Sequence, residues 1–453
     1  MLLHIFALLA LALMGGISAE YKSYDGFKIL EVNYQEPRVK KFVQEIDQHL
    51  GFMPDFLGEN WKLKQAHYFI DKDSVSKVES NFAANNITYR MRDVNPQTFK
   101  VRRRRDLNGG AVTIHDVNNR YLSYDEQMQF VNSISQQFPQ IVKLQNLGRS
   151  YEGRSITAVR IGDDGTDKPI VWIDAGVHAR EWISYNVALY LVYTIVSQPT
   201  FRDLIDHVQL VVVPNTNPDG YEYSRTHDRM WRKTRSRFTN SRCGGADANR
   251  NYPFFWGTKG VSHMECSEIF CGTRPQSEPE VLALTNAIQR EEARIKGYVA
   301  LHSYGQEILY PWGHTMHQYP ADVQDLIQVG KAMATAIKAV NNTDYTVVNS
   351  GDGLYPAAGA SDDWAKSRGI KYSYTMELSP VDDETGFSLP EDRINQVNRE
   401  AFQAIQVLML EVRSKFGAVR KMATNSAAST RSAQSSLLLN RFRTTISRGF
   451  GRG

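Results

Sequence analysis

The chain has 453 residues, of which 42% are hydrophobic and 23% are charged, so it exceeds one ordinary domain and can bury a large core. Its net charge of +4 is uneven: seven Lys and Arg residues and no acid follow Phe416, which leaves −3 for residues 1–416. A mildly acidic body argues against a nucleic-acid-binding protein.

The N-terminal segment, residues 1–19, is an apolar run that ends in small residues. This pattern predicts a signal peptide, cleaved between Ala19 and Glu20, and therefore a secreted, extracellular protein. The run is short for a transmembrane helix, and no later stretch has the length to span a membrane.

Residues 20–105 are predicted to form a small α+β domain. Short strands rich in β-branched and aromatic residues cover 27–32, 64–70 and 87–92, and apolar residues spaced by three and four predict helices over 37–50 and 74–85. Asn86 begins a glycosylation sequon, as does Asn341 further on.

Four consecutive arginines, residues 102–105, end this domain. Such a run stays extended and solvated, and at a domain junction in a secreted chain it predicts a processing site for a protease. Cleavage after Arg105 would produce a mature protein that begins at Asp106.

Residues 106–416 alternate helices with strands. Helices are expected over 124–137, 183–197, 277–293, 322–340 and 393–415. This alternation predicts an α/β domain, a mixed twisted sheet with helices on both faces. Residues 417–453 form a basic tail rich in Ser and Arg, which we expect to be disordered.

Polar residues follow three of the strand-like runs. His178 and Glu181 come after the first, His302 ends the second, and Glu377 ends the third. Ligands of open α/β sheets bind beyond the carboxyl ends of the strands, so we expect these four side chains to share one site.

The chain resembles the zinc metallocarboxypeptidases, in particular their secreted A/B subfamily. The resemblance extends over about residues 121–416 and lies in segments that follow the family's order: 176–182, 215–221, 231–235, 247–251, 302–304 and 375–378. It implies that residues 20–105 are an activation domain, which inhibits the enzyme until it is processed.

The resemblance assigns His178, Glu181 and His302 as ligands of one zinc ion per chain. Two histidines and a glutamate, with a fourth position left to water, are the zinc ligands of carboxypeptidase A itself. Glu377 corresponds to the general base and Arg232 to the residue that stabilises the oxyanion.

The resemblance also implies how a substrate is bound. Asn249 and Arg250 would bind the C-terminal carboxylate of a peptide or protein, with Arg180 and Tyr355 as further contacts. This recognition defines an exopeptidase, because an internal peptide bond offers no carboxylate.

Residues 359–364 resemble the B-type enzymes, in which the aspartate that corresponds to Asp362 lies at the base of the specificity pocket. A buried carboxylate favours Lys or Arg over an apolar side chain, and the resemblance implies that the small residues Gly313 and Thr375 also line the pocket and leave room for a long side chain. The alternative is an A-type pocket, in which Asp362 faces solvent and apolar or aromatic C-terminal residues are preferred.

The family pattern pairs Cys243 with Cys266 in a disulfide and leaves Cys271 unpaired, although pairing of Cys266 with Cys271 stays open.

Two other functions compete with a monomeric exopeptidase. One is a catalytically silent binding protein on the same fold, and the other is an interaction protein that uses the basic stretch 229–237. The complete set of ligands, base and oxyanion residue favours the enzyme.

Overall fold

The structure, a computed structural model, describes residues 21–60, 63–95, 110–162, 168–238, 243–352, 355–380 and 386–417. The predicted signal peptide, the run Arg102–Arg105 and the tail beyond Gly417 lie outside these residues. Within the described part of the chain, no helix is both long enough and apolar enough to cross a bilayer.

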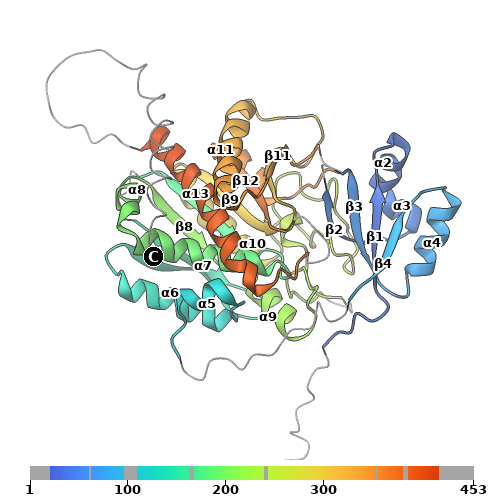
Figure 1. Cartoon of the computed structure of the whole chain (residues 1–453), viewed down its shortest axis with the longest axis horizontal. Helices are drawn as coiled ribbons and strands as arrows, with labels where there is room; N and C mark the ends of the chain where they lie inside the picture. The colour runs from blue at the N-terminus through green and yellow to red at the C-terminus, as the bar shows by residue number, and fades with distance from the viewer. Residues whose placement is uncertain are drawn as a thin grey trace, which may run out of the picture. The chain divides into compact units, whose positions relative to one another are not determined.

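Residues 21–95 form an antiparallel sheet of four strands in the order β2-β3-β1-β4, with helices on one face (Figure 1). The elements are β1 (Lys28–Asn33), α2 (Pro37–Gln44), α3 (Ile46–Leu50), β2 (Asp55–Asn60), β3 (Gln65–Ile70), α4 (Val75–Ala84) and β4 (Arg90–Asp93). We call residues 21–95 the N-terminal module.

The module differs from the sequence-based expectation in three places. The helix predicted over 37–50 is broken at Glu45 into α2 and α3. The last strand begins at Arg90 rather than residue 87, because Asn86 adopts a left-handed turn with φ 52°. Strand β2 was not predicted, since its sequence contains a glycine and two acidic residues, and its pairing with β3 is bulged between Phe56 and Gly58.

Residues 110–417 are built around a mixed sheet of eight strands in the order β11-β10-β12-β9-β7-β8-β6-β5. The strands are β5 (Val142–Arg149), β6 (Ser155–Ile161), β7 (Ile170–Ala175), β8 (Gln209–Val213), β9 (Ile295–Ser303), β10 (Glu307–Tyr310), β11 (Thr346–Asn349) and β12 (Tyr372–Leu378). The helices are α5 (Ile114–Asn119), α6 (Tyr124–Gln137), α7 (Trp182–Ser197), α8 (Arg202–His207), α9 (Pro218–Thr226), α10 (Pro279–Glu291), α11 (Val323–Asn341), α12 (Ser361–Ser367) and α13 (Ile394–Phe416), with 3₁₀ turns η2 (Pro199–Phe201), η3 (Ala248–Arg250) and η4 (Glu391–Arg393).

Helices cover both faces of this sheet, which confirms the predicted fold class (Figure 1). Alternate residues of β7 enter two separate cores: Val171 and Ile173 pack with α7, α11 and α13, whereas Ile170 and Trp172 pack with α10 and α12. The five helices predicted in this region are present to within two residues at each end. Burial on both faces explains why the central strands are continuous apolar runs.

The module contacts the body through the sheet face that its helices leave uncovered. Leu57 and Phe69 of the module share a buried apolar cluster with Met230, Tyr304 and Phe387 of the body. This contact places strand β2 beside the carboxyl ends of the body's central strands.

Candidate active site

The three central strands β7, β9 and β12 are parallel neighbours, so their carboxyl ends meet at one edge of the sheet. His302 lies in β9 directly opposite Glu377 in β12. His178 lies in the turn after β7, and Glu181 immediately precedes α7. The turn requires Gly176, which has φ +74° and lies so close to Tyr185 that a Cβ would come within 2.1 Å of the ring.

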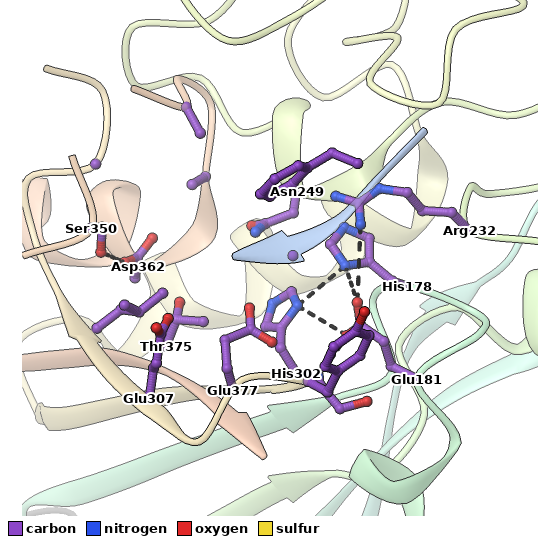
Figure 2. A pocket seen from close by; sticks show the side chains of 18 of the residues that line it. His178, Glu181, Arg232, Asn249, His302, Glu307, Ser350, Asp362, Thr375 and Glu377 are labelled. Carbon is purple, nitrogen blue, oxygen red and sulfur yellow. Dashed lines mark hydrogen bonds and ion pairs between the residues drawn. The ribbon is translucent and has the colours of Figure 1, made fainter. Parts of the chain in front are cut away.

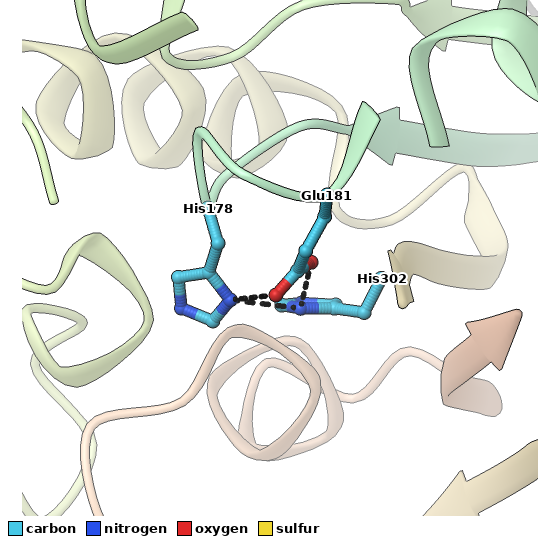
Figure 3. Close-up of side chains that lie close together, drawn as sticks. All are labelled: His178, Glu181 and His302. Carbon is cyan, nitrogen blue, oxygen red and sulfur yellow. Dashed lines mark hydrogen bonds and ion pairs between the residues drawn. The ribbon is translucent and has the colours of Figure 1, made fainter. Parts of the chain in front are cut away.

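The side chains of His178, Glu181 and His302 converge on one point (Figure 3). Oε1 of Glu181 lies 2.7 Å from Nδ1 of His178, and Oε2 lies 3.1 Å from Nδ1 of His302. The two Nδ1 atoms are 3.2 Å apart. All three side chains are buried.

These donors fit a zinc ion. Ligand atoms at about 2.0–2.1 Å from one tetrahedral zinc are about 3.3 Å apart, close to the separations seen between the two imidazoles and between His302 and Glu181. Burial opposes the charge on Glu181, but His178 and His302 hold its pKa below the usual range, so the carboxylate is ionised and available as a ligand. The cluster is therefore a candidate metal site.

Asp247 supports this cluster, a role that the sequence did not reveal. Its Oδ1 lies 3.0 Å from Nε2 of His178, on the far side of the ring from Glu181, while its Oδ2 accepts hydrogen bonds from Arg232 at 2.9 and 3.1 Å. A carboxylate on the outer nitrogen of a ligating histidine fixes the orientation of the ring. Asp247 thus positions His178 and Arg232 together.

The cluster opens into a cavity of about 190 Å³ (Figure 2). Its lining includes all of the predicted zinc ligands and catalytic residues, and every predicted substrate-binding residue except Arg180: His178, Glu181, Arg232, Asn249, Arg250, His302, Tyr355, Asp362 and Glu377. The expected pocket residues Gly313 and Thr375 line it as well, and so does Glu307, which sequence reasoning missed. Burial raises the pKa of Glu377 to about 7, a value suited to a group that takes up and returns a proton.

Asn249 and Arg250 are held by the 3₁₀ turn η3. Oδ1 of Asn249 accepts a hydrogen bond from the backbone N–H of Ser361 at 2.9 Å, which ties η3 to the start of α12. Nε of Arg250 donates to the carbonyl of Gly260 at 2.9 Å. These hydrogen bonds hold both side chains in place where they line the cavity.

Asp362 lies at one end of the cavity, in the first turn of α12 (Figure 2). It is buried, accepts a hydrogen bond from Oγ of Ser350 at 3.2 Å, and has its pKa raised to about 7 by burial and by the adjacent Asp363. Asp363 instead accepts from the backbone N–H groups of Gly313 and His314, at 2.7 and 2.9 Å. The two neighbouring aspartates thus differ: one lines the cavity, and the other holds its wall.

Two of the predicted substrate contacts touch the N-terminal module in this chain. The guanidinium of Arg180 is completely buried and binds both carboxylate oxygens of Asp55, at 2.6 and 3.1 Å. The ring of Tyr355 packs against Phe56, with centroids 5.4 Å apart. Strand β2 also lines the cavity through Phe56, Leu57 and Gly58.

The cysteines follow the family pattern. Cys243 and Cys266 form a disulfide with Cα atoms 5.0 Å apart, and Cys271 is buried and free, so the open alternative of a Cys266–Cys271 pair is not formed.

Comparisons with known proteins agree with this geometry. A family described as zinc carboxypeptidase matches residues 127–404. The chain is 42% identical over 292 residues to carboxypeptidase B of Astacus astacus (64% of this chain, 95% of the relative). It is 31% identical over 422 residues to zinc carboxypeptidase A 1 of Drosophila melanogaster (90% and 97%).

Solved structures also resemble the chain over most of its length. Thrombin activatable fibrinolysis inhibitor matches with a TM-score of 0.73 and 29% identity, covering 86% of this chain and 99% of its own. Carboxypeptidase A from Helicoverpa armigera matches with a TM-score of 0.79 and 28% identity, covering 86% and 98%. The relatives include both A and B types, so the comparisons leave the side-chain preference open.

Proposed function

The chain belongs to the zinc carboxypeptidase family, and from this premise we propose that it is a secreted exopeptidase, made as a zymogen, that releases C-terminal Lys or Arg from peptides and proteins. The observation that carries the proposal is the convergence of His178, Glu181 and His302 beside Glu377, in a cavity that also holds Asp362. The enzyme would hold one zinc ion per chain.

Zinc, when bound, supplies a Lewis acid that polarises a carbonyl and makes water a nucleophile at neutral pH. His178, Glu181 and His302 would hold it. Glu377, across the strand pair from His302, takes the proton of the attacking water and passes it to the leaving amine. Arg232, fixed by Asp247, stabilises the negative charge that develops on the carbonyl oxygen.

Asn249 and Arg250 bind the C-terminal carboxylate of the substrate. Arg232 and the metal cluster lie at one end of the cavity and Asp362 at the other, with Asn249 and Glu377 between them (Figure 2). The C-terminal residue of a substrate whose carboxylate is bound by Asn249 and Arg250 would direct its side chain towards Asp362. The buried carboxylate of Asp362 then favours a cationic side chain, because a charge left unpaired there costs about 3–5 kcal/mol.

The N-terminal module inhibits the enzyme before processing. Arg180 and Tyr355, which would contact substrate in the mature enzyme, are engaged by Asp55 and Phe56 of strand β2. Cleavage after Arg105 by a protease specific for basic sites would allow the module to leave.

The test uses the mature enzyme that begins at Asp106. We expect one zinc per chain, reversible loss of activity with a chelator, and cleavage of peptides with a free C-terminus but not of the same peptides with a C-terminal amide. An enzyme that stays active without metal, or that cuts the amidated peptides equally well, would contradict the proposal.

A further inference from the structure

A second carboxylate, that of Glu307, lies in the part of the cavity that Asp362 occupies. Glu307 is the first residue of β10, and its side chain is buried. Figure 2 shows it beside Thr375, at the end of the cavity away from Arg232 and His178. The proposed mechanism gives this group no task.

The strand register explains why Glu307 faces the cavity. In the antiparallel pair of β10 and β12, Glu307 lies opposite Glu377 and Leu309 lies opposite Thr375. Residues directly opposite in such a pair project to the same face of the sheet. All four line the cavity, so β10 and β12 together form one wall in which Glu307 is the second acidic group.

The charges of the lining residues are unequally distributed. The cationic and imidazole residues in the described lining are His178, Arg232, Arg250 and His302, which belong to the metal cluster, the oxyanion position and the predicted carboxylate site. The other polar residues that line the cavity near Asp362 and Glu307 are the neutral Ser350 and Thr375 and the acidic Glu377, which lies opposite Glu307. Two buried carboxylates in one cavity repel each other and lose hydration, and a cation placed between them relieves both costs.

We propose that Glu307 is a second specificity-determining residue, which recognises the cationic side chain of the substrate together with Asp362. This inference rests on the proposed function and deepens it, because it assigns the preference for basic residues to two walls of the pocket: the start of α12 and strand β10. A guanidinium group suits such a site, since its five N–H donors can bond two carboxylates at once.

The experiment compares two peptides that differ only in charge. One ends in arginine and the other in citrulline, which has nearly the same shape but is neutral. The ratio of their kcat/KM values is measured for the wild-type mature enzyme and for Glu307→Gln. We expect the wild type to prefer arginine strongly and Glu307→Gln to lower the ratio about tenfold, mainly through the KM for the arginine peptide.

The control is Glu400→Gln, the same change at a buried glutamate of α13 that does not line the cavity, and it should leave the ratio unchanged. Glu307→Asp, which retains the charge, should keep most of the preference. Glu307→Met provides a second neutral replacement if the Gln variant does not fold. Melting temperatures of all variants separate a loss of folding from a loss of recognition.

The outcomes that overturn the inference are distinct from those that overturn the proposed function. A wild-type enzyme that strongly prefers arginine, with a ratio unchanged within twofold in Glu307→Gln, would refute a role for Glu307 alone. An equal fall in kcat on both peptides would also refute it, because Glu307 would then act on Glu377 or on the fold. A wild type without preference for arginine over citrulline would overturn the basic specificity itself.

Discussion

Glu377 is the residue on which the proposed chemistry depends most. Glu377→Gln keeps the size of the side chain but removes its ability to accept a proton. We expect kcat to fall by about 10²–10⁴-fold, the usual contribution of a general base, while the zinc content and the binding of substrate are retained. Steady-state kinetics combined with metal analysis of the purified variant measures this.

His302→Ala is the matched comparison, because it removes the neighbouring residue across the strand pair and should lose zinc as well as activity. A Glu377→Gln enzyme with near-wild-type kcat would show that another group is the base.

Among individual residues, the strand ends predicted which side chains converge on the metal cluster and beside it, whereas the other predicted site residues, such as Arg232 and Asp362, came from the family resemblance. His178, His302 and Glu377 are examples of the strand-end residues. Asp247 and Glu307 were missed because their roles come from tertiary contacts: one reaches the outer nitrogen of a histidine 69 positions away, and the other faces the cavity through its register with β12. A lone acidic residue at the start of the apolar strand β10 was the available signal for Glu307.

Strand β2 carries Asp55, which binds the buried guanidinium of Arg180. Asp55→Asn in the unprocessed chain removes one partner of a buried ion pair, a change that typically costs about 3–5 kcal/mol. Because that loss falls on the docked state of the module, we expect the unprocessed protein to gain at least about tenfold in residual peptidase activity. Assays on protein kept intact with protease inhibitors measure this.

Asp93→Asn is the control for this change. Asp93 belongs to the same module and also forms an ion pair, with Lys28, but its side chain is 81% exposed, and exposed ion pairs contribute little. Equal activity of the Asp55 variant and the wild-type zymogen would contradict the inhibitory contact.

Helix α10 contains a buried carboxyl group that makes stability depend on pH. Burial raises the pKa of Glu280 to about 8, although one oxygen accepts a hydrogen bond from the N–H of Tyr151 at 2.9 Å. Between the ordinary pKa of 4.5 and this value, the unfolded chain releases the proton while the folded protein retains it, so stability is lost as the pH rises.

Glu280→Gln removes this titration and keeps the acceptor oxygen. We expect the variant to be close to wild type in stability near pH 4.5 and more stable at pH 8.5, by an amount on the order of a few kcal/mol at about 1.4 kcal/mol per pKa unit. Urea unfolding at the two pH values measures the difference. A gap between variant and wild type that shrinks with pH would show that Glu280 is ionised in the folded protein.

Elements with a strong periodicity of apolar residues were predicted well, whereas elements that depend on contacts with distant parts of the chain were not. Helix α13 has a continuous apolar face and was placed within one residue at each end. Strand β2 and helix α12 were missed because their sequences, rich in Gly, Asp and Asn, favour turns; β2 is stabilised by pairing with β3 and α12 by packing of Trp364.

The whole molecule is expected to mature by a single cut between its two folded parts. Replacing Arg102–Arg105 by alanine should block processing in secreting cells, because a protease specific for basic residues then has no site. Immunoblotting of the medium and N-terminal sequencing of the product measure this. A mature N-terminus far from Asp106, or full activity of the uncut protein, would contradict the account.

The predicted architecture of the whole molecule was confirmed, since alternation of helices and strands over some 300 residues leaves few arrangements. The predicted family was confirmed by the comparisons with known proteins. The resemblance implied an inhibitory module, but the contacts that hold the module on the body could not be predicted. They include an apolar contact of Leu57 and Phe69 with Met230, Tyr304 and Phe387, residues that no local pattern connects.

The most direct measurement of the central claim is kcat/KM of the mature, zinc-loaded enzyme on one peptide series that ends in Arg, Lys, Leu or Phe. Above the raised pKa of about 7, where Asp362 is ionised, Arg and Lys peptides should be cut at least about a hundredfold faster than Leu and Phe peptides, since 3–5 kcal/mol at 1.4 kcal/mol per decade gives two decades or more. Asp362→Ala should reduce that ratio sharply without loss of zinc. A wild-type enzyme that prefers Phe or Leu would contradict the account and place the protein among the A-type enzymes.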